Sequence, residues 1–353
     1  MHTLPDRDGI DGLNEDRGAY VKDGGGVAFV PSWLARPKKE RRWVNALLFA
    51  LTALTTTAAG MQMGLSMQMA LSPGGFDAAP ASLLDLGLSD LVIGLPFSLT
   101  LLGILGVHEM GHFLASRGWR VRASLPYFIP FPSMIGTLGA VIKIRSRIPH
   151  RRALIDIGAA GPLAGFVMSV AAVIIGLWLS PIVPAATFAD GGISFGNSIL
   201  SSWLSDVIVG RVPEGYAIYD HPVFTAGWLG LFVTVLNLMP VGQFDGGHIV
   251  YAVFGDRAHT LVSRATIVLL GLFWALGPPY DWVTALDVTA WIGSRWPGWL
   301  FWMFLALILG RRHPPPLDPR SELDGPRRWM GYVSLAIFIL CFVPRPISLL
   351  PPQ

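Results

Sequence analysis

Charged residues and cysteine are both scarce in this sequence. Of the 353 residues, 14% are Asp, Glu, Lys or Arg, and the single cysteine is Cys341. One cysteine can form neither an internal disulfide nor, alone, a metal site, so we expect Cys341 to pack in the interior. Residues 1–33 also lack the early apolar core that a secretory signal peptide requires. The single cysteine excludes a disulfide-stabilised domain. The low fraction of charged residues is untypical of soluble domains.

Apolar residues are correspondingly abundant. They make up 52% of the chain, and the mean hydropathy is +0.52. This composition predicts an all-α polytopic membrane protein with about seven transmembrane helices. The candidate spans are residues 43–60, 90–117, 153–184, 222–240, 261–277, 296–310 and 329–343. The run at 296–310 is short and would span a bilayer only if it extends upstream towards Trp291.

One cluster of ionisable residues ends an apolar run. Residues 91–107 carry no charge and lead directly into His108, Glu109 and His112. Two histidines four residues apart lie on one face of a helix, so both imidazoles can reach a single metal ion. Glu109 is offset from that face and can address a water at the metal. This H-E-x-x-H pattern indicates a zinc site with Glu109 as the catalytic base.

A second polar segment interrupts the run that begins at Pro222. Pro240 ends the helix, and glycines around Asp245 permit unusual backbone. An aspartate on a broken membrane segment is a candidate ligand, although Asp before glycines also suits an ordinary turn. Asn237, one turn before Pro240, is a candidate for positioning substrate or stabilising an oxyanion. An interhelical hydrogen bond is the equally weighted alternative for Asn237.

The candidate ligands together define a type of zinc site. Two histidines and one aspartate leave a fourth position for water, whereas a structural zinc site is closed by four ligands. We therefore expect Zn²⁺ as the cofactor, His108, His112 and Asp245 as its ligands, and peptide-bond hydrolysis as the reaction.

Segments beside these motifs carry further expectations. Prolines within 123–144 break helix, and 138–144 favours a strand, so we expect a β-hairpin partly inserted in the membrane, with an interfacial loop as the alternative. Gly161 and Gly165 predict a tight helix contact. Asp156 could orient a ligand, line a water path or cap a helix. Residues 61–87 and 185–222 are expected to be outer loops.

The basic residues predict an orientation. Lys and Arg number twenty in the loops assigned to the cytoplasm and two in the outer loops. This bias predicts a cytoplasmic N-terminus. The expected organisation is a disordered cytoplasmic tail with a basic flank, a first transmembrane helix, a catalytic membrane core and C-terminal transmembrane helices. Their boundaries are 1–42, 43–60, 88–255 and 260–345, respectively.

The motifs together resemble the site-2 protease family of intramembrane zinc metalloproteases. The resemblance rests on His108-Glu109-Met110-Gly111-His112, on the run Ala160 to Gly165, and on Asn237-x-x-Pro240-x-x-x-x-Asp245-Gly246. Segments such as Gly227-Trp228-Leu229-Gly230 are similar to the branch with chloroplast members and their bacterial relatives. The family usually has Leu where this chain has Phe244, which keeps an apolar neighbour.

The resemblance implies regulated intramembrane proteolysis. It implies cleavage of transmembrane segments of other proteins, with zinc held by His108, His112 and Asp245, Glu109 as the base and Asn237 positioning substrate. A bacterial inner membrane is the expected location, the lipid bilayer and transmembrane protein substrates are the expected partners, and nucleic acid is not. The alternatives are a metal-binding membrane transporter and a catalytically silent scaffold. A prenyl-protein type of zinc protease is disfavoured because no other glutamate falls in a predicted span.

Overall fold

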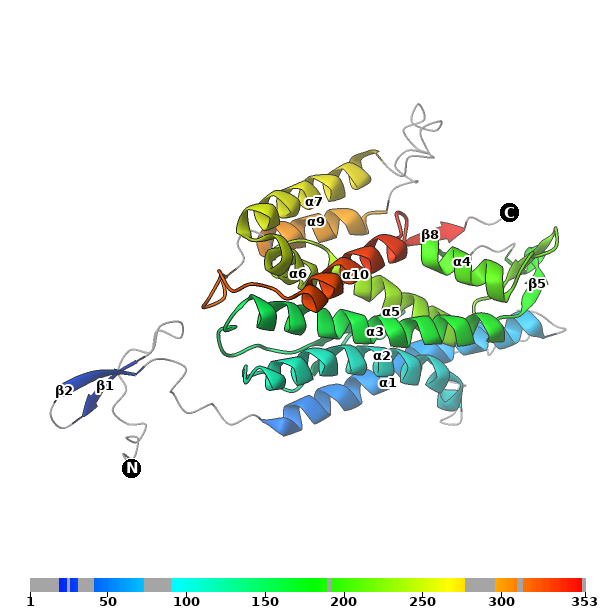
Figure 1. Cartoon of the computed structure of the whole chain (residues 1–353). Helices are drawn as coiled ribbons and strands as arrows, with labels where there is room; N and C mark the ends of the chain where they lie inside the picture. The colour runs from blue at the N-terminus through cyan, green and yellow to red at the C-terminus, as the bar shows by residue number, and fades with distance from the viewer. Residues whose placement is uncertain are drawn as a thin grey trace. The chain divides into compact units, whose positions relative to one another are not determined.

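The computed structural model describes residues 19–23, 26–30, 41–72, 90–188, 192–276, 296–309 and 314–350. These residues fall into two compact units, residues 1–43 and residues 44–353. Most of the described residues of the larger unit are helical, as the sequence predicts (Figure 1).

The N-terminal unit contains a small hairpin. Strands β1 (Ala19–Asp23) and β2 (Gly26–Val30) pair antiparallel. Val21, Val27 and Phe29 favour extended backbone, which suits this pairing. These two strands lie within the segment expected to be a disordered tail, and the other residues up to 40 lie outside the described part of the chain.

Helix α1 (Arg42–Leu71) is longer than the predicted span at 43–60. The expected outer loop at 61–87 is wrong for its first residues, because nothing between Gly60 and Leu71 breaks the helix; residues 73–89 are outside the described ranges. Gly60 lets α1 approach α2 (Leu91–Gly118) closely, since a Cβ there would lie 2.5 Å from the Gly94 carbonyl oxygen. The α2 boundaries agree with the prediction.

Helix α3 (Arg151–Leu179) packs against both α2 and α5 (Pro222–Leu238), as Figure 1 shows. Small residues permit both contacts. Gly111 of α2 faces the backbone of Ala160, and Gly227 of α5 faces the backbone of Ala172. The tight contact predicted for this part of α3 is therefore observed, and α3 is the central helix of the functional region.

The chain after Leu238 forms the second layer around this centre. Its helices are α6 (Asp245–Phe254), α7 (Asp256–Leu276), α9 (Gly298–Leu309) and α10 (Gly325–Cys341). Helix α10 packs on α3, α5 and α6, while α7 packs on α6 and α9. Cys341 is buried at the end of α10, as predicted.

Strands β3 (Tyr127–Pro130) and β4 (Thr137–Val141) form an antiparallel hairpin in the region predicted to contain one. Helix α1 supports it at two points. The Asn45 side-chain amide donates to the Pro126 carbonyl oxygen at 2.9 Å, and the Thr55 hydroxyl donates to the Gly136 carbonyl oxygen at 2.6 Å. The hairpin is thus fixed to the helical core.

The expected outer loop at 185–222 is instead largely structured. It contains η5 (Ala185–Phe188), β6 (Gly192–Phe195), α4 (Ile199–Ile208) and β7 (Tyr216–Ile218). β7 pairs with β5 (Ile182–Pro184), and β6 pairs with β8 (Ile347–Leu350). Helix α4 forms because Ser198 and Ser201 make a reciprocal capping box, a signal that the loop prediction missed.

Four described helices are long and apolar enough to cross a bilayer: α1, α2, α3 and the Asp256–Ala275 part of α7. Many of their exposed side chains are large and apolar, including Val92, Leu99 and Val167, each more than 60% exposed. Such surfaces require lipid contact, so the chain is a mostly helical membrane protein.

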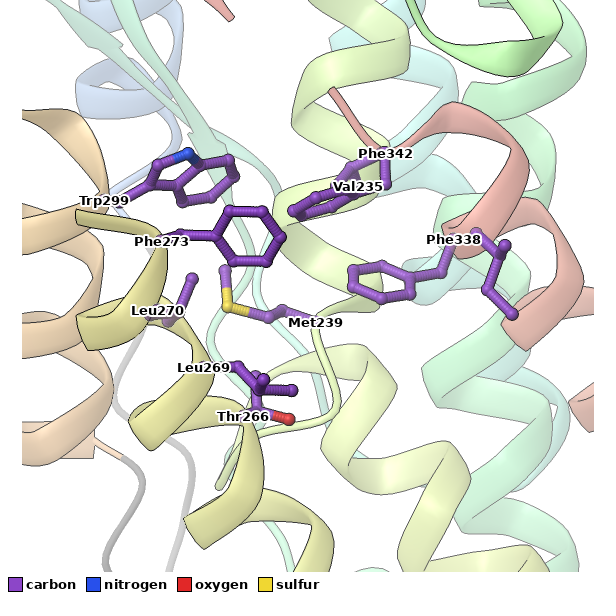
Figure 2. A pocket seen from close by; sticks show the side chains of 10 residues that line it. Val235, Met239, Thr266, Leu269, Leu270, Phe273, Trp299, Phe338 and Phe342 are labelled. Carbon is purple, nitrogen blue, oxygen red and sulfur yellow. The ribbon is translucent and has the colours of Figure 1, made fainter. Parts of the chain in front are cut away.

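An apolar cavity of about 230 Å³ lies between α5, α7, α9 and α10 (Figure 2). Its lining residues are Val235, Met239, Thr266, Leu269, Leu270, Phe273, Trp299, Phe338, Ile339 and Phe342. None of the five predicted site residues lines this cavity. The predicted functional residues therefore lie outside this cavity.

Candidate metal centre

Helix α2 presents three of the predicted residues from one turn. His108, Glu109 and His112 are all buried, with at most 6% of each residue exposed. The Nε2 atoms of the two histidines lie 3.2 Å apart. This confirms the expectation that the i, i+4 spacing directs both imidazoles to one point.

Helix α3 makes the space for these imidazoles and orients one of them. A Cβ on Gly161 would overlap the His112 ring, and a Cβ on Gly165 would lie 2.9 Å from His108 Nδ1. The Nδ1–H of His112 donates to the Ile157 carbonyl oxygen at 2.7 Å. Donation from Nδ1 leaves Nε2 as the basic nitrogen, which is the arrangement of metal-binding histidines.

The predicted broken segment delivers Asp245. Helix α5 ends at Leu238, an irregular turn follows, and Asp245 is the first residue of α6. Its Oδ2 lies 3.2 Å from His112 Nε2 and 3.8 Å from His108 Nε2. The structure therefore brings Asp245 to two histidines that precede it by more than 130 positions in the sequence.

The donor set and its spacing fit zinc. Zinc bonds to nitrogen and oxygen are about 2.0–2.2 Å long, so two donors of a tetrahedral site lie about 3.3–3.5 Å apart. The three observed separations, 3.2, 3.2 and 3.8 Å, bracket that value. Two neutral nitrogens and one carboxylate provide the charge and softness that zinc accepts. Among the described residues, His108, His112 and Asp245 are the group that could hold a metal ion.

Glu109 and Asn237 adjoin this cluster from different elements. Helix α2, which carries Glu109, packs against β4, and this contact places the hairpin beside the site as predicted. Asn237 Nδ2 lies 3.1 Å from His108 Nε2. The amide is therefore at the metal centre, and it makes the interhelical contact that was its alternative role.

Asp156 has a structural partner outside the site. Its carboxylate accepts from Arg327 of α10, at 2.9 Å to Nε and 2.8 Å to Nη2, and from Trp119 Nε1 at 3.0 Å. His150, not Asp156, caps α3, by accepting from the Ala153 N–H. Asp156 therefore ties α10 and the end of α2 to the first turns of α3.

Sequence reasoning missed the supporting residues. Ile157 contributes only its carbonyl group, which no side-chain pattern reveals. Gly161 and Gly165 were identified as a helix contact, but their i, i+4 spacing also matches that of the two histidines they accommodate. That match in spacing could have indicated that the two glycines make room for the two histidines.

The fold and the centre together define a helical membrane protein with a buried site suited to zinc. The profile of the family described as Peptidase family M50 matches residues 96–276, just over half of the chain. The chain belongs to this family, which confirms the resemblance to site-2 proteases.

The chain is similar to curated plant proteins. It is 38% identical over 257 residues to the probable zinc metalloprotease EGY1, chloroplastic, of Arabidopsis thaliana, covering 71% of this chain and 43% of the relative. It is 32% identical over 250 residues to the probable zinc metalloprotease EGY2, chloroplastic, of the same plant, covering 70% and 40%. The chain thus spans about two fifths of the length of these relatives.

Proposed function

We propose that the protein is an intramembrane zinc metalloprotease that hydrolyses peptide bonds in or near transmembrane segments of other membrane proteins, as in regulated intramembrane proteolysis. The observation that carries this proposal is that His108, His112 and Asp245 converge beside Glu109. The two histidines and Glu109 belong to α2, an apolar helix long enough to span a bilayer. Family membership supports the same chemistry.

We assign His108, His112 and Asp245 as the residues that would hold zinc. When bound, zinc supplies Lewis acidity, which polarises a substrate carbonyl and makes water a better nucleophile. The residues of the chain supply orientation and proton transfer. Ile157 holds His112 in the tautomer with a basic Nε2. Glu109, which is buried beside the two histidines, takes a proton from the attacking water and returns it to the leaving amine nitrogen.

Asn237 is proposed to position substrate. Its amide lies beside His108 Nε2 and is carried by the last turn of α5, immediately before the irregular turn. From that place it can donate a hydrogen bond to a substrate carbonyl at the metal centre.

The membrane topology is proposed to comprise seven spans with a cytoplasmic N-terminus. Helices α5 and α10, with 17 residues each, are about 25 Å long and approach the thickness of the bilayer core. The 12 residues of α9 would need the upstream extension expected from the sequence, which lies outside the described residues. Reporter fusions in successive loops would test the topology, and a periplasmic or lumenal signal at residue 150 would contradict it.

The β3–β4 hairpin is proposed to enter the membrane. Met134 and Leu138 are 56% and 64% exposed, so the hairpin presents apolar side chains outward. The two strands satisfy each other's inner backbone groups, and insertion requires that protein or water satisfies the groups at their outer edges. Quenching of a tryptophan introduced by Leu138→Trp with brominated lipid would support insertion, and full quenching by an aqueous quencher alone would contradict it.

The bilayer is proposed to be a bacterial inner membrane, as the family resemblance implies, while the curated relatives above carry the description chloroplastic. Fractionation of cells that produce the native protein tests this location. Recovery in a different membrane would contradict it.

The activity is tested with purified full-length protein and a membrane-span substrate, with and without a zinc chelator. We expect cleavage that the chelator abolishes and zinc restores. Glu109→Gln should keep zinc and lower the rate by about 10²–10⁴-fold, because it removes the proton-transferring group. Cleavage that persists in the chelator and in Glu109→Gln would overturn the proposal. Zinc binding without cleavage of any membrane-span substrate would favour the transporter or scaffold alternative.

A further inference from the structure

In the turn between α5 and α6, the backbone of Gly242 is held by side chains from outside the turn. Gly242 lies in this turn with φ of 51°, a left-handed conformation that favours glycine. The turn makes its own hydrogen bonds from Val241 N–H to Met239 and from Phe244 N–H to Val241. Gly242 instead bonds to helix α7.

Two side chains of α7 hold both backbone polar groups of Gly242. His259 Nε2 donates to the Gly242 carbonyl oxygen at 3.0 Å, and Ser263 Oγ accepts from the Gly242 N–H at 3.2 Å. His259 and Ser263 are four residues apart, which places them on one face of the helix. Each is 3% exposed. Such buried bonds are costly to leave unmade.

Helix α7 also follows the turn on its apolar side. Met239, the first residue after α5, faces the α7 residues Thr266 and Leu270 across the cavity of Figure 2. The polar contacts at His259 and Ser263 come from the same helix as these cavity-lining residues.

The opposite side of Gly242 supports the first turn of α6. A Cβ on Gly247 would overlap the Gly242 carbonyl oxygen, and a Cβ on Gly246 would overlap the carbonyl oxygen of Leu238. Gly246 and Gly247 directly follow Asp245. The Gly242 peptide is therefore enclosed between α7 and the helical turn that carries the proposed third ligand.

We infer that His259 and Ser263 are positioning residues for Asp245, acting through Gly242; this inference rests on the proposed zinc-dependent function. They touch neither the metal centre nor substrate. Their effect is to fix the peptide on which the first turn of α6 rests, and thereby the carboxylate oxygen that lies 3.2 Å from His112 Nε2. Supporting contacts of this kind set how well a ligand is preorganised.

The inference is tested with full-length protein by two metal measurements that do not require activity. One is zinc affinity by competition with a chelator, and the other is the visible spectrum of the cobalt-substituted protein, which responds to ligand geometry. The variants are His259→Leu, Ser263→Ala and His259→Gln, whose amide can still donate to Gly242. Thr266→Ala is the matched control, because its hydroxyl donates within α7 to Val262.

We expect His259→Leu and Ser263→Ala each to weaken zinc binding by about 10-fold and to alter the cobalt spectrum. His259→Gln should restore both properties, and Thr266→Ala should leave them unchanged. Restoration by Gln distinguishes positioning from a general loss of folding. If the wild type binds zinc and both disruptive variants match its affinity and spectrum, the inference is overturned while the proposed function stands. If the wild type binds no zinc, the proposed function fails and the inference fails with it.

Discussion

The two halves of the metal centre are built in different ways. His108 and His112 come from one uninterrupted helix, and the helical period alone directs them to the same point. Asp245 comes after an irregular turn whose shape depends on contacts with α6 and α7. The geometry of the histidine half thus depends on local helical structure, and the geometry of the aspartate half depends on tertiary packing.

The largest expected effect removes a ligand from the helical half. His112→Ala should weaken zinc binding by more than about 100-fold, beyond the usual effect of losing a supporting contact. Zinc content by mass spectrometry after purification measures it. His221→Ala is the control, because this histidine caps α5 by accepting from the Val223 N–H. Equal zinc content in both variants would remove His112 from the centre.

A matched pair of glycines compares the halves directly. Gly161→Ala would push a methyl group into the His112 ring, and Gly246→Ala would push one into the Leu238 carbonyl group. Each should destabilise the fold by about 1–3 kcal/mol and lower zinc affinity. Gly103→Ala is the control, since no atom lies within 4 Å of its added Cβ. Thermal unfolding and chelator competition report both effects. Wild-type behaviour of Gly161→Ala would show that α3 does not restrict the imidazole.

The smallest effect is expected from a substitution outside both halves of the metal centre. Arg327→Leu breaks the ion pairs with Asp156 and Asp324. The Arg327 and Asp156 side chains are 26% and 23% exposed, so solvent screening limits the loss of stability to about 1 kcal/mol. Zinc affinity should not change. The neighbouring, exposed Arg328 provides the control variant Arg328→Leu. If Arg327→Leu loses zinc and Arg328→Leu does not, then α10 also helps to shape the metal centre. The centre would then depend on α10 in addition to its histidine half and its aspartate half.

The same contrast explains what could be predicted from the sequence. The boundaries of α2 and the two histidine positions follow from an apolar run and a four-residue spacing, which are local properties. The break after α5 was predictable because Pro240 cannot continue a helix without loss of a hydrogen bond. The contribution of His259 was not, because a buried histidine on a helix does not reveal which distant carbonyl group it reaches.

Two segments show where local reasoning failed. Residues 61–71 were expected to be part of a loop because residues 61–87 contain no Lys or Arg and include Met-rich and Pro-Gly-Gly turns. Close packing at Gly60 and Gly64 favours a continuing helix instead. The segment 185–222 was expected to be an outer loop with one basic residue, Arg211. Its short strands form through pairing with distant segments, including β8 near the C-terminus, and such pairing has no local signature.

The most direct test of the central claim is the zinc content of Asp245→Ala beside the wild type, measured by mass spectrometry with helix content followed by circular dichroism. If two distant segments hold one ion, the wild type will carry one zinc per chain, and the variant will lose it with its helices intact. A variant that retains a full complement of zinc would contradict the account.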